Sequence, residues 1–129
     1  YTREDEDGKT QPGPRRINVD TLPARGSSAG GGYSTAPDLL AFDAAMRAEK
    51  LLSPAWTDWY FSDKEKAPVA GAPARKHSGA GGFAGGSPGV NAVIETDLDT
   101  GYSIVVLSND DPPSAEAVAK KIRQWLGLS

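Results

Sequence analysis

The sequence predicts an α+β fold in which helices come first, an antiparallel sheet follows, and a final helix covers that sheet. Three observations support this prediction. Helix-start signals and helical spacing of apolar residues recur within 34–63, and two runs rich in β-branched residues flank a tight turn at 98–101. An amphipathic segment closes the chain at 112–128. The length of 129 residues suffices for one hydrophobic core.

Residues 1–33 are predicted to form an extended, loop-rich arm. The stretch REDEDGK is charged, QPGPRR cannot hold a helix, and RGSSAGGG is rich in glycine and serine. Three prolines in this arm, Pro12, Pro14 and Pro23, each lack a backbone N–H donor. We therefore expect the arm to gain its order by packing against other parts of the protein.

Residues 34–63 are predicted to form a helical segment with two helices. The first has a Ser/Thr cap, Pro37 near its first turn and Asp38 at the positive end of the helix dipole. Its predicted apolar face consists of Leu39, Phe42 and Met46. The second helix starts at Ser53 and Pro54. Its predicted apolar stripe consists of Trp56, Trp59 and Tyr60, which we interpret as core packing rather than a ligand platform.

Residues 64–129 are predicted to form an antiparallel sheet of about three strands plus a C-terminal helix. Strands are expected at 89–97 and 101–110, and the glycine-rich stretch 81–89 is expected to be the turn into the first of them. An unbroken apolar run, from Ile104 to Leu107, predicts a strand buried on both faces. The predicted buried face of the last helix consists of Ala115, Val118, Ile122, Trp125 and Leu126.

Composition excludes several classes of protein. The chain has no cysteine and one histidine, so neither a disulfide, nor a Cys-type zinc site, nor a His-rich metal site is expected, and we expect no cofactor. A formal net charge of −3 gives no reason to expect a nucleic-acid partner. No apolar run approaches the length of about 18 residues that a membrane span needs.

The glycine-rich stretch HSGAGGFAGGSPG, residues 77–89, contains that single histidine and matches several loose motifs. GAGGFA fits a dinucleotide loop, but no apolar strand precedes it and no helix follows. The pattern G-x-S-x-G occurs around Ser28 and Ser87, again without the strand–turn–helix context of a nucleophile elbow. A triad of either serine with His77 remains open as a weaker alternative. DLDTG (97–101) is interpreted as a hairpin turn rather than a calcium loop.

Two long stretches of the chain together resemble one protein family. RGSSAGGGYSTAPDLLAFDAAMRAEKLLSP is followed by HSGAGGFAGGSPGVNAVIETDLDTGYSIVVLSNDDPP and then by the terminal amphipathic helix. Their order and spacing are similar to those of the serine β-lactamase-like hydrolases, which include class C β-lactamases, penicillin-binding proteins, D-aminopeptidases and esterases. The resemblance covers most of the chain and implies the C-terminal part of a β-lactamase/transpeptidase-like fold.

The resemblance also implies roles for four consecutive residues. The family carries a Lys/His-x-Gly motif on a strand that lines the active-site cleft, and His77-Ser78-Gly79 resembles that motif. His77 and Ser78 would then bind substrate or assist proton transfer. Ala80 would donate one backbone N–H to the oxyanion hole, an interaction worth on the order of 3 kcal/mol.

Two other motifs of the family are absent from these 129 residues. No serine is followed by lysine three positions later, and no tyrosine is followed by asparagine two positions later. We therefore expect the C-terminal fragment of a serine hydrolase that performs acyl-enzyme hydrolysis of an amide, β-lactam or ester and that is inactive without its nucleophile. A non-catalytic binding or assembly module derived from the family is the alternative.

The expected partner of this chain is another polypeptide. The strand at 101–109 would expose an apolar edge, which favours pairing with the missing N-terminal part of the same protein or with a second copy of the chain. The parent protein would take a small-molecule or peptide-like substrate. The resemblance is compatible with a periplasmic or secreted location, and we expect no membrane span.

Overall fold

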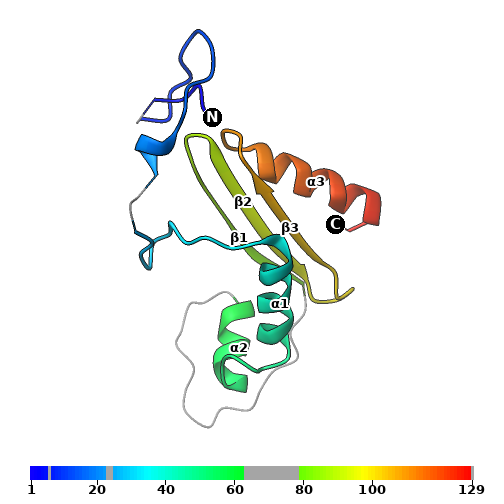
Figure 1. Cartoon of the computed structure of the whole chain (residues 1–129). Coiled ribbons are helices and arrows are strands. Elements are labelled where there is room, and N and C mark those ends of the chain that lie inside the picture. The colour runs from blue at the N-terminus through cyan, green and yellow to red at the C-terminus, as the bar shows by residue number, and fades with distance from the viewer. Residues whose placement is uncertain (6, 23–24, 63–78, 129) are drawn as a thin grey trace.

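The computed structural model describes residues 1–5, 7–22, 25–62 and 79–128 (Figure 1). This part of the chain forms, in order, a 3₁₀ turn at Val19–Thr21, α1 at Ala36–Arg47, α2 at Pro54–Phe61, β1 at Ala80–Ser87, β2 at Val90–Asp97, β3 at Ser103–Ser108 and α3 at Ser114–Leu126. The predicted α+β class is confirmed. No helix within the described ranges is long and apolar enough to cross a membrane.

The sheet is antiparallel with strand order β1-β2-β3, so β1 and β3 are its two edges among the described residues. The first pairing runs without interruption from Ala80↔Asp97 to Ser87↔Val90. The second runs from Asn91↔Ser108 to Thr96↔Ser103. Side chains alternate between the two faces of a sheet, and paired residues share a face. This register therefore fixes which side chains point toward which helix.

The prediction that 81–89 forms only a turn is wrong, because most of that stretch is strand β1 and the turn itself is Pro88-Gly89. Two of the glycines are needed for steric reasons. Gly82 has φ +153°, and a Cβ there would lie 2.2 Å from the carbonyl oxygen of Ile94. A Cβ on Gly86 would lie 2.7 Å from Cγ of Pro112. The glycines therefore allow close backbone approach within a strand rather than breaking it.

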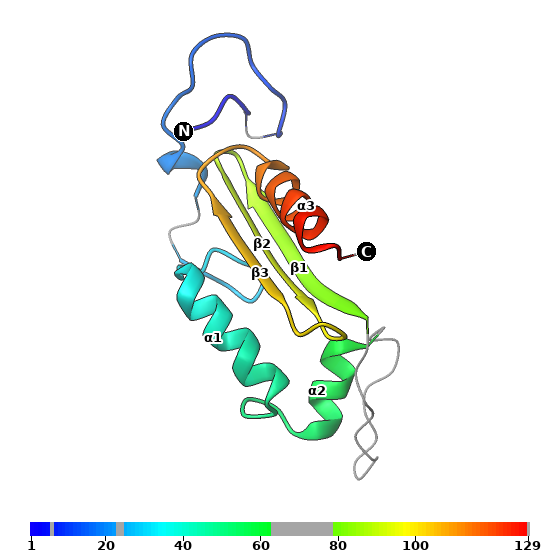
Figure 2. The same cartoon turned by 90° about the vertical axis from the view of Figure 1, so that its right-hand side faces the viewer.

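One face of the sheet packs against α3 through a small apolar core (Figure 2). The buried members of this core are Val93, Ile104, Ala115 and Ala119. The two alanines have no exposed surface and let the helix lie close to the strands. The predicted face of this helix is partly wrong, since Val118 is 48% exposed and Trp125 is 78% exposed. Ala115 and Ala119 are the buried members from this helix, and Ile122 packs against the core as predicted, so the helix is turned with Val118 and Trp125 toward solvent.

The other face of the sheet carries α1 (Figure 2). The apolar stripe predicted for this helix is also partly wrong. Met46 is buried as expected, but Phe42 is 39% exposed while Asp43 is only 4% exposed. In the second helix Thr57 is buried and Trp56 is 45% exposed. On β3, Ile104 is buried but Leu107 is 45% exposed, which contradicts burial on both faces. Because β3 is an edge strand, the two helices cover only part of it.

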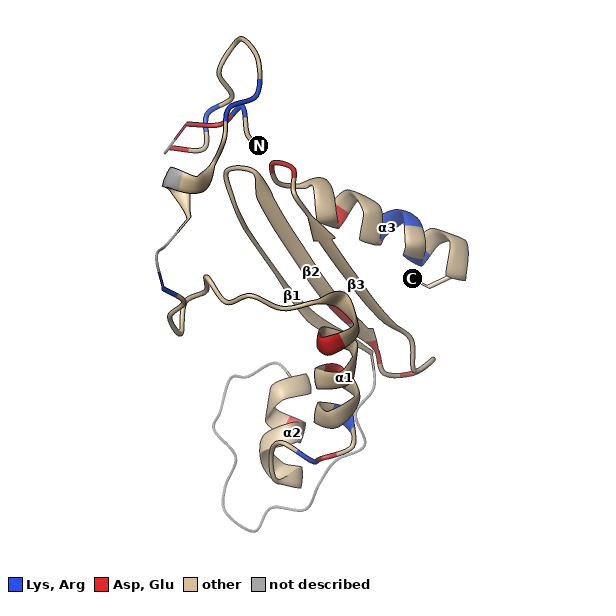
Figure 3. Ribbon diagram, viewed as in Figure 1, with Lys and Arg blue, Asp and Glu red and all other residues tan. Residues whose placement is uncertain are grey.

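The N-terminal arm lies against the end of the sheet where β1 turns into β2 (Figure 1). Asp111, in the loop between β3 and α3, accepts hydrogen bonds from Thr2 Oγ1, from the backbone N–H of Arg3 at 3.1 Å and from that of Gly89 at 2.7 Å. Figure 3 shows charged residues of both signs in this arm, and Arg15 forms an ion pair of 2.8 Å with Asp110. The arm is therefore attached through polar contacts.

Candidate functional site

The backbone at the start of β1 leaves one N–H free of the sheet. The carbonyl oxygen of Gly79 accepts from the N–H of Leu98 at 2.8 Å. Asp97 uses its own N–H and carbonyl on the β3 side, with Tyr102 and Gly101, both at 2.8 Å. Bonded and non-bonded pairs alternate in antiparallel sheets, so Ala80↔Asp97 is a non-hydrogen-bonded pair. The N–H of Ala80 therefore points outward from the β1 edge of the sheet.

Gly79, which precedes Ala80, is held by the turn between β2 and β3. Gly79 has φ +86°, and its N–H donates to Oδ2 of Asp99 at 2.9 Å. Within the turn, Oδ1 of Asp97 accepts from the N–H groups of Asp99 at 3.1 Å and Thr100 at 2.8 Å. Hydrogen bonds from Thr100 hold the pKa of Asp97 below its ordinary value. Both aspartates thus serve a hairpin turn, as the interpretation of DLDTG proposes.

The other predicted site residues are not all brought together. Gly79 and Ala80 are adjacent at the sheet edge, whereas His77 and Ser78 lie outside the described residues. Ser87 is at the opposite end of β1, about 23 Å from Ala80 at the usual rise of a strand. Ser28 lies in an exposed turn of the arm, where Ser27 and Gly30 bond to each other. The described part of the chain therefore gives neither serine the setting of a nucleophile elbow.

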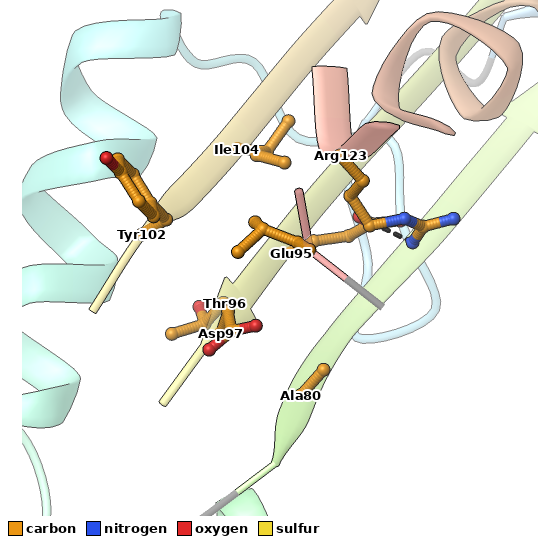
Figure 4. Close-up of a pocket in the computed structure, with 8 residues that line it drawn as sticks. Ala80, Glu95, Thr96, Asp97, Tyr102, Ile104 and Arg123 are labelled. Atoms are coloured by element: carbon orange, nitrogen blue, oxygen red, sulfur yellow. Dashed lines mark hydrogen bonds and ion pairs between the residues drawn. The ribbon is translucent and has the colours of Figure 1, made fainter. Parts of the chain in front are cut away.

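A small pocket lies between the start of β1 and the C-terminal half of α3 (Figure 4). Its volume is about 60 Å³, and an ion pair of 2.7 Å joins Arg123 to Glu95 beside it. The pocket is lined by Ala80, Glu95, Thr96, Asp97, Tyr102, Ile104, Arg123 and Leu128. It is smaller than typical ligand pockets and has room for a few water molecules. Among the residues described, no group of three or more potential metal ligands is arranged to hold an ion.

A buried polar cluster joins α1 to the opposite face of the sheet. The carboxylate of Asp43 accepts hydrogen bonds from Thr96 Oγ1 and from Ser103 Oγ, the latter at 2.5 Å. It also forms an ion pair with Nε of Arg47, one helical turn later, at 2.9 Å. The apolar face predicted for this helix does not include Asp43, so the cluster was not predicted from the sequence. The spacing of Asp43 and Arg47, four residues apart on a helix, was the available signal.

The second helix is connected to the same region through aromatic side chains. Burial raises the pKa of the Tyr60 hydroxyl, and the charge of Asp43 raises it further. The ring of Tyr60 meets that of Phe61 edge-on, with centroids 5.0 Å apart. Cδ1 of Phe61 lies 3.5 Å from the place that a Cβ on Gly81 would occupy. Phe61 therefore packs on β1 directly beside Ala80.

A protein-family model described as Beta-lactamase matches residues 2–129, so the chain belongs to the Beta-lactamase family. No curated protein and no solved structure matches it significantly. The helices and the antiparallel sheet agree with the C-terminal part of a β-lactamase-like fold, a fold of serine hydrolases.

Proposed function

We propose that this chain is the C-terminal part of a serine hydrolase and supplies the β1 wall of its active site. The reaction is acyl transfer from an amide, β-lactam or ester through an acyl-enzyme. The observation that carries the proposal is the outward N–H of Ala80 at the sheet edge of a chain that belongs to the Beta-lactamase family.

Acyl transfer requires a fixed hydrogen-bond donor, and the β1 edge offers one in the N–H of Ala80. When a serine attacks a carbonyl carbon, negative charge develops on the carbonyl oxygen, and a fixed N–H donor stabilises it. The N–H of Ala80 fills this role because the ladder to β2 leaves it unused. Gly79 has no side chain, and nothing lies within 4 Å of the place that a Cβ there would occupy, so a substrate can approach the backbone closely. His77 and Ser78 bind substrate or assist proton transfer in this proposal.

The nucleophile comes from outside these 129 residues, because none of their serines lies in a Ser-x-x-Lys motif. We propose that the segment that carries it completes the sheet beside β3. Two features support this: β3 is an edge strand of the described sheet, and the apolar side chain of Leu107 is 45% exposed on it. A second copy of the chain is the alternative occupant of this edge. A non-catalytic binding module remains the second candidate function, since the same missing motif favours it.

Because β3 is an edge strand, the oligomeric state of the isolated chain tests whether a partner strand pairs with it. We expect gel filtration with light scattering to show self-association, because an unpaired apolar strand edge pairs with another strand. Adding the nucleophile-bearing segment should convert the oligomers to a one-to-one complex. A monomer that stays soluble and folded at all concentrations would contradict the proposed role of the edge.

The oxyanion role is tested by removing one N–H group. Proline at an outward-facing position of an edge strand deletes the donor without breaking the ladder to β2. In the protein that includes the nucleophile, we expect Ala80→Pro to lower kcat by about 10²-fold or more with a small change in KM. Ala84→Pro is the matched control, because its N–H points outward from the same edge four residues further along.

Equal losses of kcat in Ala80→Pro and Ala84→Pro would overturn the oxyanion assignment, since both variants share any general effect of proline on β1. Thermal unfolding of the two variants, measured alongside, separates a loss of folding from a loss of the donor.

A further inference from the structure

Three residues, one from each strand, form a row across the sheet: Gly81, Thr96 and Ser103. Asp43 of α1 accepts hydrogen bonds from the hydroxyls of Thr96 and Ser103. At the third position, Phe61 of α2 packs against Gly81, with Cδ1 3.5 Å from the place that a Cβ would occupy. Both helices therefore contact the same row of the sheet.

This row is the immediate neighbour of the proposed oxyanion donor. Ala80↔Asp97 is a non-hydrogen-bonded pair, so by alternation Gly81↔Thr96 is a hydrogen-bonded pair. A shift of Thr96 is thus transmitted through two backbone hydrogen bonds to Gly81, and through one peptide link to the N–H of Ala80. No mobile side chain intervenes along this route.

We propose that Asp43 is a positioning residue that fixes the place of the Ala80 N–H by holding Thr96. This inference rests on the function proposed above. The attachment of α3 to the other face differs, because its centre is an apolar core, with the ion pair between Arg123 and Glu95 and the hydrogen bond from Asn91 to Glu116 beside that core. A buried polar cluster adds direction instead, since its hydrogen bonds are satisfied in only one register.

The two hydroxyls that Asp43 holds provide a matched pair of variants. Thr96→Val and Ser103→Ala each remove one hydrogen bond to the same carboxylate, but only Thr96 is bonded to the strand that carries Ala80. In the protein that includes the nucleophile, we expect Thr96→Val to lower kcat by about tenfold with KM nearly unchanged, because small misplacements of catalytic groups slow the chemical step. Ser103→Ala should lower it by less than about twofold.

Two further measurements separate positioning from stability. Thr96→Ser keeps the hydroxyl and should restore kcat. The backbone amide resonance of Ala80, assigned by NMR in the same protein, should move in Thr96→Val and stay in place in Ser103→Ala. That resonance reports the local geometry whether or not the reaction occurs.

Equal effects of Thr96→Val and Ser103→Ala on kcat, or an unmoved Ala80 resonance in Thr96→Val, would overturn the positioning role. A moved resonance, together with full activity in Ala80→Pro, would support the positioning of Ala80 by Asp43 while overturning the proposed oxyanion function. The two proposals therefore fail in different ways.

Discussion

Two aspartates, Asp43 and Asp111, hold distant segments of the chain onto the same sheet. Asp43 attaches α1 through Thr96, Ser103 and Arg47, whereas Asp111 attaches the N-terminal arm. Asp43 is 4% exposed, while Asp111 lies partly open to solvent. Water can replace the contacts of an exposed carboxylate but not those of a buried one. An aspartate therefore forms a rigid junction at Asp43, where it is buried, and a reversible junction at Asp111, where water reaches it.

The largest effect is expected at Asp43. We expect Asp43→Ala to lower the free energy of unfolding by about 2–3 kcal/mol, because it leaves the buried Thr96 hydroxyl and the partly buried Ser103 hydroxyl without their acceptor. Chemical denaturation measures this change. Asp38→Ala is the matched control, since Asp38 lies on the same helix but is exposed, and it should cost about 1 kcal/mol or less.

A loss of less than about 1 kcal/mol in Asp43→Ala would remove the contrast between the two aspartates, because it would show that solvent reaches the Asp43 cluster as well.

The smaller effect is expected at Asp111, and it depends on pH. Burial raises the pKa of this carboxyl, but hydrogen bonds from Thr2, Arg3 and Gly89, together with the charge of Arg15, more than offset burial and hold the pKa below its ordinary value. A group whose pKa is lowered on folding contributes stability above its ordinary pKa and loses that contribution as pH falls through the lowered value. We therefore expect the arm to detach in acid, as the pH falls below the ordinary pKa of an aspartate, while the sheet remains folded.

An NMR titration of the Arg3 and Gly89 amide resonances measures this detachment. Asp111→Asn keeps the size of the side chain but cannot titrate, so it should remove the acid transition from both resonances. Persistence of the same transition in Asp111→Asn would assign it to a different group and contradict the role of Asp111.

Much of the fold could be predicted because local rules decide it. Pro37 and Asp38 mark the start of α1, where Thr35 Oγ1 caps the N–H of Asp38 at 3.3 Å. The turn at 98–101 and the position of α3 follow from glycine, proline and apolar periodicity in the same way. The glycine-rich strand was missed because its glycines are required by neighbours such as Ile94 and Pro112, which are distant in sequence.

The buried faces of the helices could also be predicted only in part from the sequence. Periodicity indicates that α1 and α3 are amphipathic, but it does not say which side chains at the margin of the apolar stripe face the sheet. Trp125 lies outside the core, whereas Ala119 lies inside it and Ile122 packs against it, because α3 approaches the sheet closely along its line of alanines. Asp43 is buried because Thr96 and Ser103, more than fifty residues later, supply its donors.

The sequence by itself determined the α+β class, the order of helices and strands, and the membership of the Beta-lactamase family that its motifs indicate. Those features depend on residues close together in the chain. Only the tertiary structure decided that the N–H of Ala80 points outward and that Asp43 holds the row beside it. Both depend on strand register and helix docking, which are set by contacts between residues far apart in sequence.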